Sequence, residues 1–376
     1  MNNTKHSTQT RPPLVRMAKR ENISPARAWG VRLAAIFFAL VINALLIYSI
    51  TKMNPIDVYV SMYKGAFGSS RRLWSLIREI CMLLCISVAL APAFKMRFWN
   101  IGAEGQVLAG GIATAACMIY LGDKLPTPLL FVLMILTSII AGAVWGLIPA
   151  IFKAKWNTNE TLFTLMMNYI AIQITSYCVA LWENPYGSNT VGVINSQTNA
   201  GWLPTLFGQK YSWNVIIVLA LTVLVFLYLK FSKQGYEIAV VGESENTARY
   251  AGINVKKVIL RTMLISGAIC GIAGFIGVAG VDHTISTNTA GGRGFTAIII
   301  AWLAKFNTLT MILMTTLIVF LDQGATQIVS EYSKLGINDY VAEIIKGIIL
   351  FFILGSEFFV NYRLIFRSGR HASKQG

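Results

Sequence analysis

Residues 31–50 read VRLAAIFFALVINALLIYSI, a run in which Arg32 is the sole charged residue. Its length matches the roughly 20 apolar residues that an α-helix needs to cross a bilayer. A secretory signal peptide has a shorter apolar core, about 7–15 residues, and ends at a small-residue cleavage site. No such site follows this run. The stretch therefore predicts a retained transmembrane helix.

Similar runs recur along all 376 residues, of which 55% are apolar and only 13% are charged. A soluble domain carries about 25% charged residues. We therefore predict an all-α, polytopic bundle of about ten membrane segments. The predicted crossings are 31–51, 73–94, 101–121, 129–151, 161–182, 213–231, 258–280, 308–328 and 339–356. The tenth segment, 295–304, is half a crossing long. It is compatible with a short span, a re-entrant half-helix or the start of a bent helix.

The distribution of basic residues predicts the orientation, because cytoplasmic loops of membrane proteins are enriched in lysine and arginine. With both termini in the cytoplasm, about two thirds of the 32 lysines and arginines fall on that side. The exception is the basic stretch 52–72, which is placed outside as a loop. This gives a basic N-terminal tail (1–27), without structure over 1–25, a membrane domain (28–360) and a basic C-terminal tail (361–376). We expect the protein in the inner membrane of a bacterium.

Two long hydrophilic loops lie on opposite sides in this topology. The outer loop, 183–211, suits a docking surface or lid, or a plain connection. The cytoplasmic loop, 234–257, contains Ser244 as a plausible N-cap, with a short helix over 246–251 and Gly252 as its left-handed stop.

Nothing in the sequence indicates an enzyme. No segment matches the phosphate-binding pattern G-x-x-x-x-G-K-[ST], so nucleotide hydrolysis in this chain is not expected. The five cysteines have no ligand-like spacing, and the three histidines lie far apart. We expect no metal and no cofactor in this chain. The net charge of +16 sits in short clusters between apolar runs, without a basic face, and we expect no nucleic-acid partner.

Intramembrane charges are costly and therefore informative. Glu104 lies in the polar, glycine-rich stretch 100–106, where Asn100 is a plausible helix cap. A structural role at a helix start and a role in a gate or pathway are both open for Glu104. Closely spaced glycines predict tight helix packing. They are Gly142 and Gly146, and then Gly267, Gly271 and Gly274.

Four motifs resemble the permease subunits of ATP-binding-cassette importers, within the simple-sugar and nucleoside branch of the branched-chain amino acid and ribose permease family. They are FWNIGAEGQ (98–106), NETLFTLMMNYI (159–170), GESENTARYAGINV (242–255) and GGRGFTAI (291–298). The resemblance covers residues 30–360. The form of residues 100–106 is more similar to nucleoside permeases than to those for ribose or branched-chain amino acids.

The resemblance implies a transport subunit with a separate ATPase partner that binds ATP. It also implies a second homologous permease subunit, in a heterodimer, and an extracellular or lipid-anchored solute-binding protein that meets the outer loops. By the same analogy, four side chains lie near the substrate path, namely Asn100, Glu104, Gln106 and Asn168. The coupling helix that rests on the ATPase is formed by Glu243, Ser244, Asn246, Ala248, Tyr250, Ala251 and Gly252.

Two alternatives to a nucleoside importer remain. One is a permease for a simple sugar such as ribose or galactose. The other is a self-sufficient, proton-coupled transporter that uses Glu104 or Glu343 as its proton site.

Overall fold

The computed structural model describes residues 15–20, 24–52, 54–206, 208–335 and 338–366, so the predictions for 1–14 and 367–376 lie outside the described residues. The chain divides into two compact units. The terminal unit combines Met1–Tyr63 with Gly324–Gly376, and the central unit is Lys64–Gln323. The predicted membrane domain, 28–360, therefore runs through both.

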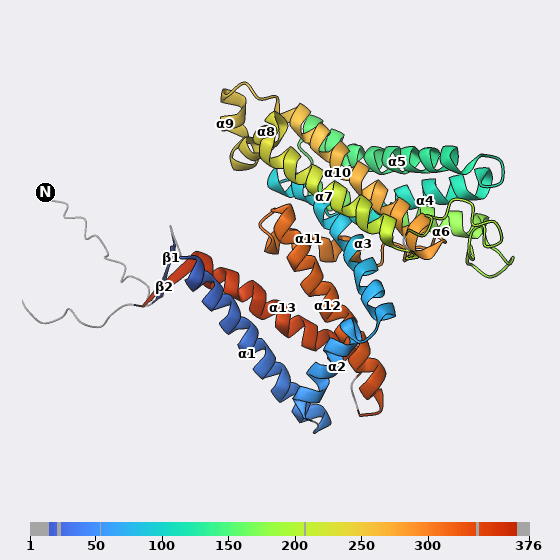
Figure 1. Ribbon diagram of the computed structural model, residues 1–376. Coiled ribbons are helices and arrows are strands. Elements are labelled where there is room, and N and C mark those ends of the chain that lie inside the picture. Colours follow the sequence, from blue (N-terminus) through green and yellow to red (C-terminus); the bar gives the residue numbers. More distant parts are fainter. Residues whose placement is uncertain (1–14, 21–23, 53, 207, 336–337, 367–376) are drawn as a thin grey trace, which may run out of the picture. The chain divides into compact units, whose positions relative to one another are not determined.

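The terminal unit is built on two helices that pack along each other, α1 (Pro25–Thr51) and α13 (Asp339–Asn361) (Figure 1). Proline suits the first turn of α1, because its missing N–H would have no partner there. Arg32 pairs with Glu357 at 2.6 Å, and the Asn43 side-chain amide donates to the Ile345 carbonyl at 3.1 Å. These contacts join the two ends of the sequence.

The tail expected to be without structure over 1–25 contains a strand, which corrects that prediction. Residues Val15–Lys19 form β1, which pairs antiparallel with β2 (Tyr362–Phe366). Because α1 and α13 lie side by side, the chain enters α1 and leaves α13 at the same end of the helix pair. The backbone groups beyond them then satisfy one another across a two-stranded ladder.

The sequence also missed a helix in the basic stretch 52–72. Residues Pro55–Phe67 form α2, followed by α3 (Ser70–Lys95). Val58 and Met62 of α2 are buried four residues apart, which is the spacing of one helix face. The surrounding lysine and arginines concealed that periodicity. The chain returns to the terminal unit within α12 (Thr308–Tyr332) and a 3₁₀ turn at Ser333–Leu335.

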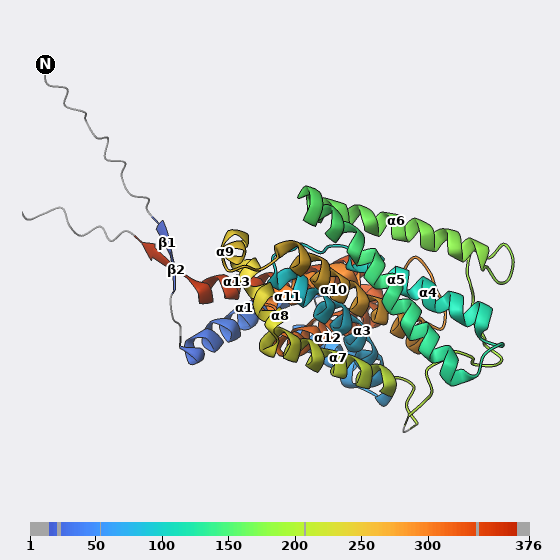
Figure 2. The same cartoon turned by 90° about the horizontal axis from the view of Figure 1, so that it is seen from above.

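The central unit is a helical bundle, and Figure 2 shows its helices from above. After α3 come α4 (Ala103–Leu121), α5 (Thr127–Trp156), α6 (Glu160–Leu181) and α7 (Ser212–Phe231). Two short helices, α8 (Lys233–Glu243) and α9 (Glu245–Tyr250), precede α10 (Val255–Gly277), whose last turn widens into a π-helix at Val278–Asp282. The half-length α11 (Arg293–Leu303) follows.

Eight helices among the described residues are long and apolar enough to cross a membrane. They include α1, α3 to α7, α10 with its π turn, and α12. The predicted crossing at 339–356 is helical as part of α13, which is not among the eight. Of the three alternatives for 295–304, a continuous bent helix is wrong, because left-handed Lys305 and Phe306 separate α11 from α12. At 11 residues, α11 is about 16 Å long, half a bilayer core.

Candidate functional site

The core of the central unit is a close crossing of α10 with α5 and α4. A Cβ atom added at Gly142 would overlap the Gly267 carbonyl oxygen, and one added at Gly110 would lie 2.5 Å from the Gly271 carbonyl oxygen. Gly274 packs in the same way on the backbone of Val107. In lipid, helices associate through such close backbone contact. The glycines therefore fix α4, the helix that carries the polar stretch, against α10.

The stretch 100–106 folds into a buried polar corner between α3 and α4. Asn100 is fully buried, and its amide nitrogen donates to Gln106 Oε1 at 3.3 Å and to Ser266 Oγ of α10 at 3.2 Å. Its Oδ1 accepts from the Gly102 N–H and from Gln106 Nε2, both at 3.1 Å. The expected capping role of Asn100 is wrong, because α4 begins at Ala103 and Gly102 occupies its N-cap position.

Asn168 of α6 clamps the same corner from the other side. Its Oδ1 accepts from the Gly105 N–H at 2.9 Å, and its Nδ2 donates to the Ile101 carbonyl at 2.9 Å. Thr164, one turn earlier on α6, accepts from the Ile101 N–H at 3.2 Å. Non-helical backbone at membrane depth is tolerated only where it is buried in protein or lines a water-filled cavity. These side chains satisfy its polar groups here.

Glu104 joins the starts of two helices. It lies in the first turn of α4, is 7% exposed, and accepts from the Gly292 N–H at 2.7 Å and the Gly294 N–H at 2.8 Å. Those donors belong to the first turn of α11, which carries partial positive charge and has unpaired N–H groups. A Cβ at residue 294 would lie 2.6 Å from Glu104 Oε2. Only glycine admits the carboxylate so close to this backbone.

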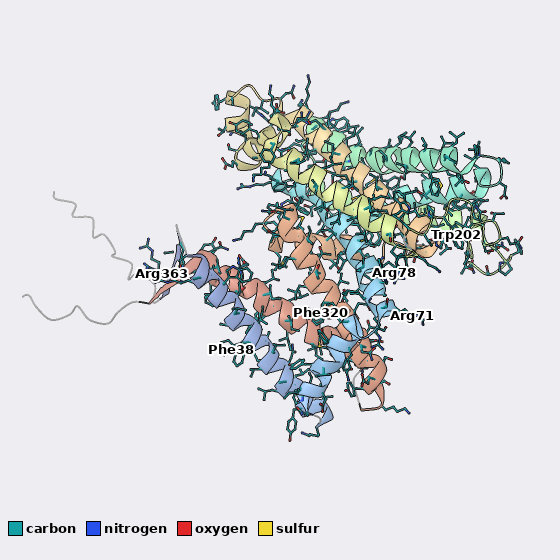
Figure 3. All side chains as sticks on the ribbon, in the orientation of Figure 1. Phe38, Arg71, Arg78, Trp202, Phe320 and Arg363 are labelled. Atoms are coloured by element: carbon teal, nitrogen blue, oxygen red, sulfur yellow. The ribbon has the colours of Figure 1, made fainter. Side chains whose placement is uncertain are left out.

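A charged cluster lies at the start of α11, and the sequence did not reveal it. Arg293 donates to Glu79 Oε2 at 2.7 Å, and Arg78 donates to Glu79 Oε1 at 2.7 Å. Arg78 and Arg293 thus pair with the two oxygens of one carboxylate. Arg71 and Arg78 follow one another along α3 (Figure 3). The two partners of Glu79 come from α3 itself and from a helix 214 residues later.

The α8–α9 hairpin presents a surface to solvent. Ser244 caps α9 by accepting from the Thr247 N–H at 3.3 Å, and Gly252 has φ of +76°, which bears out the expected start and stop of this short helix. Ala248 is fully buried, whereas Tyr250 is 93% exposed. The expected loop at 234–257 had missed α8.

Two contacts tie the hairpin to the transmembrane helices. Gly242, at the end of α8, packs on the carbonyl oxygen of Lys95 so closely that a Cβ would overlap it. Arg261 of α10 pairs with Glu237 of α8 at 2.9 Å. A force applied to the hairpin therefore acts on the ends of α3 and α10.

In the segment predicted as the outer loop, 183–211, described residues contact the end of α10. The Trp202 and His283 rings stack at 3.9 Å with an interplanar angle of 5°, and Trp202 Nε1 donates to the Ile194 carbonyl at 2.8 Å. The Ile194 N–H donates to the His283 carbonyl at 2.8 Å. Burial, with a smaller effect of nearby Lys210, lowers the pKa of His283 below its usual value. The neutral, stacked ring is thus favoured.

The structure brings Asn100, Gln106 and Asn168 into one network and places Glu104 beside it, facing α11. Their side chains hydrogen-bond within the chain. Their place beside the substrate path stays a prediction. Among the described residues, no three of the histidine, cysteine, aspartate and glutamate side chains lie close enough together to hold a metal ion.

The sequence matches a family model described as the branched-chain amino acid transport system / permease component, over residues 72–354. Among curated proteins, the guanosine ABC transporter permease protein NupP of Bacillus subtilis is 30% identical, over 87% of this chain and 93% of its own length. The glucose ABC transporter permease protein TsgB13 of Haloferax volcanii is 27% identical, over 92% of each chain. The nucleoside ABC transporter permease protein NupB of Lactococcus lactis is 26% identical, over 86% of this chain and 90% of its own length.

Proposed function

Because the chain belongs to the family of permease components of branched-chain amino acid transport systems, we propose that it is the membrane subunit of an ATP-driven importer for nucleosides. Its relatives include guanosine and nucleoside permeases over most of its length, which favours that cargo. A simple sugar is the second candidate, because a glucose permease is similar over a still longer alignment.

In this proposal, a separate ATPase subunit docks on the exposed α8–α9 hairpin. That subunit binds and hydrolyses ATP, and its movement displaces the hairpin. The observation that carries the proposal is the contrast within α9, where Ala248 is buried and Tyr250 is almost wholly exposed. Of the expected coupling residues, Ser244 is half-buried and Ala248 is buried. The exposed ones are Glu243, Asn246, Tyr250, Ala251 and Gly252. The hairpin's contacts with Lys95 and Arg261 offer a route from hydrolysis to helix movement.

The buried residues Asn100, Glu104, Gln106 and Asn168 have a positioning role in this proposal. They hold the corner between α3 and α4, and the start of α11, in a fixed arrangement beside the pathway. Glu104 already accepts two backbone hydrogen bonds. This occupation supports an ATP-driven mechanism over one in which Glu104 carries a proton across the membrane.

Further subunits belong to the same proposal. We expect a second permease of the same family, a lipid-anchored binding protein that meets residues 183–211, and a bacterial cell membrane as the location. The folded state of the outer segment supports a docking role, because a rigid surface loses little conformational entropy when a partner binds.

Uptake of radiolabelled guanosine tests the function, in cells that lack this chain and receive either the wild type or Tyr250→Asp. We expect ATP-dependent uptake that the substitution abolishes while the protein still reaches the membrane. Tyr340→Asp is the matched control, since Tyr340 is 79% exposed and lies outside the hairpin. Unlabelled glucose that competes as well as unlabelled guanosine would transfer the assignment to sugars. Normal uptake by Tyr250→Asp would refute the coupling role.

A further inference from the structure

Three lysines gather at one end of the central unit, around a cavity of about 300 Å³. Lys95 ends α3, Lys230 lies in the last turn of α7, and Lys305 lies in the turn between α11 and α12. The other lining residues are Phe226, Leu229, Phe306, Asn307 and Thr308. No lining residue is acidic, so the wall of this cavity carries three positive charges and no carboxylate.

The cavity also contains hydrogen-bonding capacity that the described chain leaves unused. Thr308 is 2% exposed, lines the cavity, and its hydroxyl has no hydrogen-bond partner among the described residues. An unpaired buried hydroxyl is unfavourable. Lys95 Nζ reaches only a carbonyl, that of Leu229 at 3.3 Å, among the hydrogen bonds resolved for it. An anion with several acceptor oxygens would satisfy these donors together.

Exposed apolar side chains lie close to the lining residues in sequence. Phe231 and Leu309, next to the lining residues in sequence, are exposed, and Lys230 Nζ lies 5.2 Å from the centre of the Phe226 ring. The helices that meet here are among those long enough to cross a bilayer, so their ends lie at the depth of the lipid headgroups. Positive charge beside exposed apolar side chains at that depth matches an anionic phospholipid, with its phosphate in the cavity and its chains along the helices.

We propose that this lysine cavity, defined by Lys95, Lys230 and Lys305, binds the phosphate of an anionic lipid headgroup. The bound lipid would tie together the ends of α3 and α7 and the turn that leads into α12, where the three lysines lie. The site adjoins the α8–α9 hairpin at Lys95, whose backbone carbonyl Gly242 contacts, but its other lining residues belong neither to the hairpin nor to the Asn100 network.

The test is retention of phosphatidylglycerol by the full chain in nanodiscs, measured by native mass spectrometry against a phosphatidylcholine background. Each lysine near an anionic lipid surface contributes about 1 kcal/mol. Lys305→Gln should therefore weaken phosphatidylglycerol binding about fivefold, and the triple Gln variant more strongly. The control removes three exposed charges elsewhere, at Lys64, Arg71 and Lys124, and should retain the lipid as the wild type does.

Three outcomes would overturn the proposal. The first is unchanged retention in Lys305→Gln, a single exposed substitution that should fold even if the triple variant does not. The second is equal loss in the control, which would mean that net charge alone attracts the lipid. The third is binding of inorganic phosphate to the chain in phosphatidylcholine nanodiscs, together with no preference for phosphatidylglycerol over phosphatidylcholine. That result would identify a soluble phosphate as the ligand.

Discussion

The two polar stretches that interrupt the apolar sequence, 100–106 and 242–252, have opposite environments in the central unit. In the first, Asn100, Glu104 and Gln106 are buried and hydrogen-bonded within the chain. In the second, most side chains face solvent and Tyr250 is 93% exposed. Two stretches of similar polarity thus form a buried hydrogen-bond network in one place and a solvent-exposed surface in the other.

The difference shows how to separate stability from function in this chain. A buried polar group that loses its partner is penalised by the full desolvation of the group left behind. An exposed side chain returns to water with little change in free energy. Substitutions in 100–106 should therefore act on folding, and those in 242–252 on partner binding. The following predictions run from the largest expected change in the free energy of unfolding to the smallest.

Removal of the Glu104 carboxylate should have the largest effect. Glu104→Ala leaves the N–H of buried Gly294, and that of the more exposed Gly292, without its carboxylate acceptor, and should lower the free energy of unfolding by about 3 kcal/mol. Unfolding in detergent by heat or denaturant measures this. Glu243→Ala, on the exposed end of α8, is the matched control and should change little. If the two variants were equally stable, the contrast between the two stretches would fail.

Loss of the Asn168 clamp should be the next largest effect. Asn168→Ala removes the acceptor for the Gly105 N–H and the donor to the Ile101 carbonyl, and should destabilise the chain by about 2 kcal/mol. Asn246→Ala, on exposed α9, makes the same chemical change in the other stretch. The same unfolding assay would contradict the prediction if Asn246→Ala were the more damaging of the two.

His283 provides an intermediate, half-buried case. Its pKa is lowered in the folded chain, so below the ordinary histidine value of about 6.5 the unfolded chain binds more protons than the folded one. Stability should consequently fall as pH drops below about 6.5, and level off above it. Solvent screening keeps the effect below about 1 kcal/mol.

The check is the melting temperature between pH 5 and 8, for the wild type and His283→Phe. The phenyl ring preserves an aromatic partner for Trp202 and cannot be protonated, so the pH dependence should be weaker in the variant. Identical pH profiles would remove His283 as the cause.

Tyr250→Ala should produce the smallest change in stability, below about 0.5 kcal/mol, because its side chain is almost entirely in solvent. The same variant should bind the partner ATPase more weakly, as measured by co-purification of that subunit. Strong destabilisation together with normal ATPase binding would instead show that Tyr250 contributes to folding, as the buried residues of 100–106 do, and not to partner binding.

Sequence patterns located most of the helices, because burial in lipid demands long apolar runs and those are visible locally. The positions of Ser244 and Gly252 likewise delimited α9, since capping depends on neighbouring residues. Basic residues hid α2, and polar residues hid α8, because short amphipathic helices lack the length that makes a crossing recognisable.

What the sequence determined by itself is therefore the class of the molecule, namely a helical membrane protein with two polar stretches and a resemblance to importer permeases. Only the tertiary structure decided what those polar groups do. Glu104 meets backbone donors 188 and 190 residues away, and Glu79 meets an arginine 214 residues away. A hydrogen bond depends on which backbone groups the packed helices bring within reach, and no local pattern of residues specifies that.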